Sequence, residues 1–274
     1  MLKLGLLEPQ TDPLHSAAEI LVRACQTERV TQLYACFSGG NDSLATAFVT
    51  SAHPAFAGCF HIRTGCGIPE ATIHVREVCR RYGWPLHEVE PPARQYEDLV
   101  LEFGFPGPAA HRFMYSWLKE RAIRAFVRDK KRFGRVGLVT GVRRSESRRR
   151  MGTAQPILRE GSRVWIAPLL HWDSLEVRDF LAERRAPISP VVAALGLSGE
   201  CCCGCYAEEG ELDRIALHFP TYADWLDCLM ERARRAGVHA VWGKRPARPC
   251  SYGVREAAGQ MVLCAGCEFR AGAK

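Results

Sequence analysis

A short loop with two glycines and two hydroxyl groups is the clearest chemical feature of this sequence. Residues 38–43 read Ser-Gly-Gly-Asn-Asp-Ser and lie between two apolar runs, the first strand-like and the second helix-like. A strand–turn–helix of this kind directs backbone N–H groups and the positive end of the helix dipole at one point. Ser38 and Ser43 add hydroxyl donors. The pattern predicts an anion site, with Asp42 as a helix cap or a magnesium ligand.

Arginines form the second feature. Residues 143–150 hold five arginines in eight positions, directly after an apolar run at 136–140. Guanidinium groups bind phosphate and sulfate oxygens in pairs. A solvated charged loop is the alternative, but a position at the end of a strand favours an anion-binding surface.

Cysteines crowd into the last third of the chain. Of 13 in total, four lie within five residues at 201–205, and Cys250 and the C-x-x-C pair Cys264 and Cys267 follow. Thiolates of this spacing suit tetrahedral zinc or an iron–sulfur cluster. A redox dithiol or two buried thiols is the alternative for the late pair. Spacing alone does not fix which of Cys201, Cys202, Cys203, Cys205 and Cys250 complete the ligand set.

The cysteines of the first third are scattered and have no metal-binding spacing. We predict that most of them are small buried side chains of the core. They are Cys25, Cys36, Cys59, Cys66 and Cys79.

The elements that position these groups alternate between helix and strand. Helical periodicity covers residues 14–28, 70–82, 113–129 and 174–183, and strand-like runs cover 33–37, 57–62, 86–89, 136–140 and 165–169. This alternation predicts a parallel twisted sheet with helices on both faces, and ligands at the carboxyl ends of its strands. The loop at 38–43 and the turn at 63–65 should therefore share a cleft. The basic face of the 113–129 helix, which includes Lys119, is predicted to be solvated.

Composition sets the outer limits. With 274 residues, 47% of them hydrophobic, the chain can bury a sizeable core, and no apolar run reaches the roughly 18 residues that span a bilayer. The first residues lack the features of a signal peptide, so a cytoplasmic protein without a membrane partner is expected. The net charge of +7 fits a polyanion such as an adenine nucleotide, DNA or tRNA. The Walker pattern and G-x-G-x-x-G are both absent.

Residues 34–267 resemble the phosphoadenylyl-sulfate (PAPS) reductase-like branch of the PP-loop ATP pyrophosphatase superfamily. The loop at 38–43 matches the pyrophosphate-binding loop of that superfamily. Residues 61–65, His-Ile-Arg-Thr-Gly, are similar to its H-x-D-T-G segment, and residues 141–150 to its G-x-R-x-x-E-S…R segment. The implied fold is that of the adenine nucleotide alpha hydrolases, with a nucleotide-binding α/β domain at 1–186 and a helical or irregular cysteine-rich, metal- or iron–sulfur-binding region at 187–274 packed on it.

The resemblance also implies the site residues. Those expected to act in catalysis are Ser38, Asp42, Ser43 and Arg143. Those expected to bind the nucleotide are Ser38, Gly39, Gly40, Asn41, Asp42, Ser43, Arg63, Thr64, Gly65, Gly141, Arg143, Glu146 and Arg150.

A metal centre follows from the same resemblance. Adenylyl-sulfate reductases hold a [4Fe-4S] cluster on a tandem cysteine pair and a later C-x-x-C. A subset linked to DNA phosphorothioation shows G-E-C-x-C-G instead, and residues 199–204 fit it. The implied ligands are Cys201, Cys203, Cys264 and Cys267, with Cys202, Cys205 or Cys250 as substitutes and zinc as the alternative metal.

Two departures from the reductases bear on function. Arg63 stands where the reductases carry Asp, and their C-terminal E-C-G-L-H segment, which holds the nucleophilic cysteine, has no counterpart at residues 267–274. These departures count against thioredoxin-coupled reduction of adenylyl sulfate or PAPS, which is the second hypothesis.

The preferred hypothesis is an ATP-dependent sulfurtransferase, an ATP pyrophosphatase that uses Mg²⁺ with ATP and an iron–sulfur cluster. The expected acceptor is DNA, in phosphorothioation, with tRNA thiolation close behind. A cysteine desulfurase or another sulfur donor is the expected partner. A non-enzymatic zinc ribbon that binds nucleic acid is the third hypothesis, and it leaves the loop at 38–43 unexplained.

Overall fold

A six-stranded sheet forms the centre of the fold in the computed structural model, which describes residues 13–146 and 154–244. The strand order is β3-β2-β1-β4-β6-β5. The strands are β1 (Val30–Cys36), β2 (Phe56–Ile62), β3 (Leu86–Val89), β4 (Arg135–Val139), β5 (Ile157–Glu160) and β6 (Arg163–Ile166). All neighbouring strands run parallel except β5, which pairs antiparallel with β6 at the edge. The predicted α/β fold with a mostly parallel sheet is confirmed.

Two of the strand expectations need correction. The edge strand β5 was not predicted, because its four residues are too short and too mixed in polarity to give a clear pattern. The last parallel strand begins and ends earlier than the expected 165–169, because a turn follows it, in which the Leu170 N–H donates to the Ala167 carbonyl at 3.2 Å.

The central strand β1 is covered on both faces. Leu33 and Ala35 point into one apolar cluster, and Tyr34 between them points into another. Strands of parallel sheets read as continuous apolar runs for this reason.

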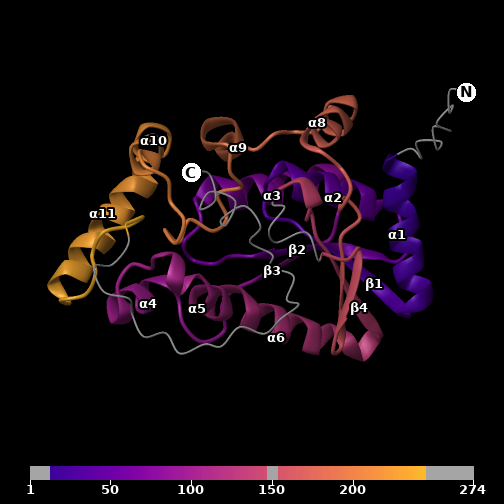
Figure 1. The fold of residues 1–274 in the computed structure, drawn as a ribbon, viewed down its shortest axis with the longest axis horizontal. Coiled ribbons are helices and arrows are strands. Elements are labelled where there is room, and N and C mark those ends of the chain that lie inside the picture. The colour runs from indigo at the N-terminus through magenta and orange to yellow at the C-terminus, as the bar shows by residue number, and fades with distance from the viewer. Residues whose placement is uncertain (1–12, 147–153, 245–274) are drawn as a thin grey trace, which may run out of the picture.

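Helices form a layer on each face of the sheet (Figure 1). One cluster of buried side chains joins the sheet to α1 (Pro13–Thr27), α2 (Asn41–Ser51), α3 (Pro69–Tyr82) and α8 (Ser174–Glu183). A second cluster joins the other face to α6 (Arg121–Lys130).

The helix predicted at 113–129 is built from three consecutive pieces. These are α5 (His111–Tyr115), a π-helical turn η2 (Ser116–Glu120) and α6. A π-turn inserts a residue into the helical repeat and is frequent at functional sites. The short 3₁₀ turns nearby are η1 (Pro108–Ala110), η3 (Lys131–Phe133) and η4 (Arg144–Glu146).

The chain after α8 forms a group of helices, the last of which lies at one end of the molecule (Figure 1). It contains α9 (Pro190–Leu195), α10 (Glu211–His218) and α11 (Pro220–Arg235). A third apolar cluster joins α11 and the cysteine run (residues 201–205) to α4 (Tyr96–Phe103), α5 and Cys66. The division of the chain at 186/187 stays a prediction.

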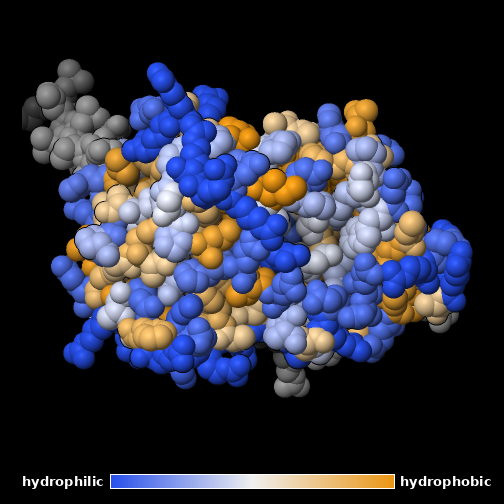
Figure 2. All heavy atoms as spheres, turned by 180° about the vertical axis from the view of Figure 1, so that it is seen from behind, coloured by the Kyte–Doolittle hydropathy of each residue, from blue (hydrophilic) through white to orange (hydrophobic). Residues whose placement is uncertain are grey.

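The surface is mixed in polarity. On the reverse face, apolar residues occur in small groups among hydrophilic ones (Figure 2). Among the described residues, no helix is long and apolar enough to cross a bilayer.

Candidate functional site

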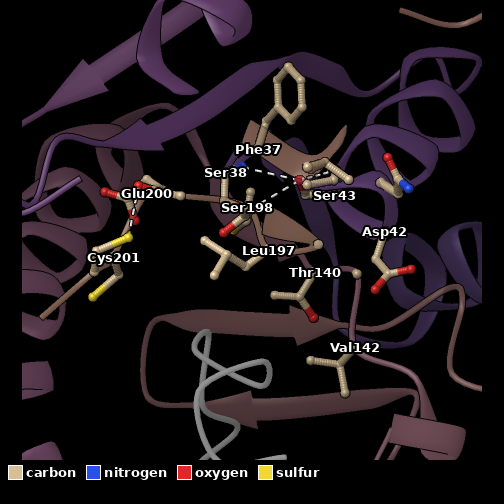
Figure 3. Close-up of a pocket in the computed structure, with 18 of the residues that line it drawn as sticks. Phe37, Ser38, Asp42, Ser43, Thr140, Val142, Leu197, Ser198, Glu200 and Cys201 are labelled. Carbon is tan, nitrogen blue, oxygen red and sulfur yellow. Dashed lines mark hydrogen bonds between the residues drawn. The ribbon is translucent and has the colours of Figure 1, made fainter. Parts of the chain in front are cut away.

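One cavity of about 580 Å³ lies at the carboxyl ends of the central strands. Its walls include most of the loop at 38–43, the strand ends at 140–143 and residues 196–207, which contain the whole cysteine run. Figure 3 shows Asp42 on one side of this cavity and Cys201 on the other, with Ser38 and Ser198 between them. Segments 160 residues apart in the sequence therefore face the same space.

The loop at 38–43 has the geometry of an anion site. Gly39 has φ +88°, a left-handed conformation that favours glycine, and α2 begins directly after Gly40. No side chain caps this helix, so its first N–H groups keep their directions toward the cavity. The Ser43 hydroxyl accepts from the Ser38 N–H and the Ser38 hydroxyl, both at 3.2 Å, and donates to the Gly40 carbonyl at 2.8 Å.

Asp42 pairs with Arg143 instead of capping α2. The two carboxylate oxygens lie 2.9 Å from Arg143 Nε and 3.2 Å from Nη2. Arg143 Nη1 also donates to Ser145 Oγ and Ser174 Oγ, each at 3.1 Å. Only 7% of Arg143 is exposed. The guanidinium group is thus held rigidly in the cavity wall, where a phosphate or sulfate group would meet a fixed positive charge.

A second cation reaches the cavity from the π-turn. Lys119 Nζ lies 3.2 Å from Glu200 Oε2, and the two side chains are 8% and 5% exposed. The prediction that Lys119 belongs to a solvated basic face is wrong. The π-turn directs Lys119 toward the sheet, a displacement that α-helical periodicity does not reveal.

The turn at 63–65 lies behind the cavity. Arg63 is exposed and pairs with Glu90 at 2.8 Å. Thr64 is buried, where its N–H donates to Glu200 Oε1 at 3.1 Å and its hydroxyl to the Glu200 carbonyl at 2.7 Å. Arg63, Thr64 and Gly65 do not line the cavity. This turn holds Glu200 in place and makes no contact with the space beside the loop at 38–43.

The cysteine run lines the far side of the cavity. Cys202, Cys203 and Cys205 are buried and Cys201 is half-buried. The backbone of the run is fixed by Tyr96, whose hydroxyl donates to the Cys203 carbonyl, and by the Trp242 indole, which donates to the Cys202 carbonyl, each at 2.9 Å.

The described thiols alone do not form a metal site. Among residues 13–146 and 154–244, no three His, Cys, Asp or Glu side chains converge on one point. Cys264 and Cys267 of the expected ligand set, and the substitute Cys250, lie outside the described residues, as does Arg150. The side chain of Glu146 is outside them too.

Cys66, which was expected in the core, is fully buried, and its thiol contacts that of Cys201. Burial raises the pKa of its thiol well above the usual value, and a hydrogen bond with the Cys201 thiol raises it further. Cys59 and Cys79 are also buried, as predicted, while Cys25 and Cys36 are half-buried.

Several residues that line the cavity were not predicted from the sequence. Ser198 lies so close to Gly40 that a Cβ at Gly40 would be 3.1 Å from that of Ser198. Residues without a detectable sequence signal are Lys119, Thr140, Ser174, Ser198 and Tyr206. They reach the cavity from separate elements, so no local pattern connects them.

Comparisons with known proteins agree with this architecture. The family model of the phosphoadenosine phosphosulfate reductase domain matches residues 32–205, a range that contains both the loop at 38–43 and the cysteine run. No curated protein matched the chain.

Three solved structures illustrate the likeness. Phosphoadenylyl-sulfate reductase from Candida auris, in a phosphate complex, is 21% identical, with a TM-score of 0.49 over 65% of this chain and 83% of that one. FMN adenylyltransferase from Candida glabrata, with FMN and an ATP analogue, is 14% identical, with a TM-score of 0.49 over 67% and 60%. The NH3-dependent NAD synthetase from Campylobacter jejuni is 11% identical, with a TM-score of 0.46 over 86% and 97%.

These three likenesses concern the fold and carry no argument about the reaction. The match of the family model carries more weight, because it covers more than half of the sequence. It includes the loop at 38–43, the buried Arg143 and the cysteine run at 201–205. The chain belongs to the phosphoadenosine phosphosulfate reductase domain family.

Proposed function

We propose that this protein is an ATP pyrophosphatase of sulfur metabolism, which adenylates an acceptor at the cavity between the loop at 38–43 and the cysteine run. The single cavity that both walls share carries the proposal, because its volume of about 580 Å³ lies within the range of small-ligand pockets. A nucleotide with its phosphates at the loop would extend toward the thiols.

The chemistry asked of this chain is mainly positioning and charge stabilisation. The loop N–H groups and the Ser38 and Ser43 hydroxyls hold the β- and γ-phosphates. An acceptor oxygen attacks the α-phosphorus, the bond between that phosphorus and the bridging oxygen breaks, and pyrophosphate leaves with the negative charge. Arg143, held by Asp42, stabilises that charge in the transition state.

Magnesium is expected to arrive with ATP, where it would neutralise phosphate charge. Asp42 is the carboxylate of the loop, and both of its oxygens face Arg143, so any Mg²⁺ ligation by Asp42 must share it with that arginine. The [4Fe-4S] cluster, or zinc, stays a prediction on Cys201, Cys203, Cys264 and Cys267. No step of the proposed reaction is routed through it.

The acceptor is proposed to be a nucleic acid, DNA before tRNA. The net charge of +7 and the match of residues 199–204 to the G-E-C-x-C-G pattern support this order. Pyrophosphate release from ATP should rise when the acceptor is present, so parallel assays with duplex DNA and with bulk tRNA separate the two.

Reduction of an adenylyl sulfate is the second candidate. The family match and the Cys201 thiol on the cavity wall favour it. Two product assays decide between the reactions. One measures sulfite released from adenylyl sulfate or from PAPS with thioredoxin as reductant, and the other measures pyrophosphate released from ATP.

The decisive variant for the nucleotide half is Asp42→Ala. It removes the counter-charge of the buried Arg143 and should abolish turnover of ATP while the metal content, measured after anaerobic purification, stays at the wild-type value. Loss of metal and turnover together would indicate a folding defect instead. Turnover at the wild-type rate would contradict the assignment of the loop.

A further inference from the structure

Two thiols that are 135 positions apart in the sequence meet at the wall of the cavity. Cys66 is 0% exposed and Cys201 is half-buried and lines the cavity. The two side chains are in hydrogen-bonding contact, and neither sulfur is in a disulfide. One thiol of this pair is therefore open to small molecules and the other lies directly behind it.

Backbone contacts hold the pair together. The Ile68 N–H donates to the Gly199 carbonyl at 2.7 Å, and the Cys202 N–H donates to the Cys66 carbonyl at 3.1 Å. Between these two bonds, Glu200 and Cys201 face a single residue, Gly67, in the manner of a β-bulge.

Gly67 permits this approach. A Cβ at Gly67 would lie 2.6 Å from the Glu200 carbonyl oxygen, so a larger residue would force the two segments apart. The Tyr222 hydroxyl, which donates to the Cys66 carbonyl at 2.8 Å, fixes the other side. The thiols are held in contact by the fold itself and need no rearrangement to meet.

A second pair of thiols provides a comparison within the same molecule. Cys59 and Cys79 are also hydrogen-bonded to each other, with exposed fractions of 0% and 2%, but they lie in the apolar cluster between β2 and α3. Neither lines the cavity. In both pairs the two thiols contact each other, but only the pair of Cys66 and Cys201 has a thiol that small molecules in the cavity can reach.

We propose that Cys66 and Cys201 are a redox-active dithiol that exchanges with low-molecular-weight disulfides entering the cavity. The Cys201 thiolate attacks one sulfur of the disulfide, which forms a mixed disulfide and releases the first thiolate. The Cys66 sulfur then attacks the Cys201 sulfur, and the second thiolate leaves with the proton that Cys66 gives up. Two protein thiols lose two electrons in total, and the small disulfide becomes two thiols.

This inference is independent of the nucleotide reaction. It agrees with the finding that the described thiols do not converge in threes, because a dithiol needs only two. A metal bound by Cys201 would compete with the exchange, and metal analysis of the same preparation measures that competition.

The test uses the full-length protein, freshly reduced and desalted, with oxidised glutathione as the probe and peptide mass mapping as the readout. The expected product is a cross-link between the peptides of Cys66 and Cys201. It should form more than about tenfold faster than any link between Cys59 and Cys79, because those thiols are inaccessible. Cys228, which is exposed on α11, should acquire only a glutathione adduct.

Two variants separate the steps. Cys66→Ser should stop at glutathione on Cys201, and Cys201→Ser should leave Cys66 as a thiol. Cys66→Ala repeats the first test without a buried hydroxyl, and circular dichroism checks that each variant folds.

Three results would overturn the proposal: an unreactive Cys201 in protein free of metal, a stable glutathione adduct on Cys201 of the wild type without the cross-link, or equal cross-linking of Cys59 with Cys79. Each can occur with ATP turnover intact, so the nucleotide proposal is judged separately.

Discussion

The two walls of the cavity are built in different ways. The phosphate wall comes from six consecutive residues at 38–43, together with Arg143 from the segment that follows β4, the neighbour of β1 in the sheet. The thiol wall is assembled from the cysteine run, the turn at 64–68 that holds it from behind, and Lys119 on a π-turn. One wall depends on local backbone geometry and the other on contacts between distant segments. Substitutions should therefore affect them differently: the first in turnover, the second in stability.

After the complete loss of turnover expected for Asp42→Ala, the largest effect is expected from Arg143→Ala. Removing one fixed positive group from the transition state should lower kcat/KM for pyrophosphate release about 100- to 1,000-fold. Arg144→Ala is the matched control, because Arg144 is exposed, its side chain donates to the Ala154 carbonyl at 3.3 Å, and it does not line the cavity. Equal losses in both variants would mean that general positive charge matters, and not the Arg143 geometry.

A stability effect is expected on the thiol wall from Lys119→Met. This change leaves the Glu200 carboxylate buried without its cation, and breaking a buried pair in this way costs about 3–5 kcal/mol in the free energy of unfolding. Urea titration measures it, with Lys119→Met/Glu200→Gln expected to recover part of the loss.

Lys130→Met is the control for this experiment. Its partner Asp129 is half exposed, so that pair should contribute less than about 1 kcal/mol. If Lys119→Met unfolded no more easily than Lys130→Met, the thiol wall would not depend on its buried ion pair.

The smallest effect is expected from Gly39→Ala, in the phosphate wall. Gly39→Ala imposes a left-handed conformation on a residue with a Cβ, at a cost of about 1–2 kcal/mol. Gly83→Ala, at φ +66° with no atom within 4 Å of an added Cβ, should cost a similar amount. Only Gly39→Ala should also raise the KM for ATP. A KM that rises equally in both variants would show that global destabilisation explains the change.

The same difference between the walls explains how far the sequence could be interpreted. The loop at 38–43, the strand before it and α2 after it follow from glycines, hydroxyls and hydrophobic periodicity within about 20 residues. The Lys119–Glu200 pair and the Cys66–Cys201 contact join residues 81 and 135 positions apart. No local pattern carries such information.

The turn at 63–65 shows a second limit of interpretation from the sequence. Its position at the end of β2 predicted that it would share a cleft with the loop at 38–43, but residues 63–65 do not line the cavity and Thr64 holds Glu200. Its contact with a nucleotide stays a prediction. A strand end shows which edge of the sheet a residue occupies. It does not show whether another segment, here the one at 199–202, lies between that residue and the cavity.

The central claim is that a nucleotide's phosphates bind at the loop in a cavity that the thiols share. A crystal structure with a non-hydrolysable ATP analogue and Mg²⁺ tests it most directly. The account predicts phosphate oxygens within hydrogen-bonding distance of the N–H groups of residues 39–43 and of Arg143, with the Cys201 thiol in the same enclosed space. An empty loop, with the analogue bound elsewhere or Cys201 screened from it by protein, would contradict the account.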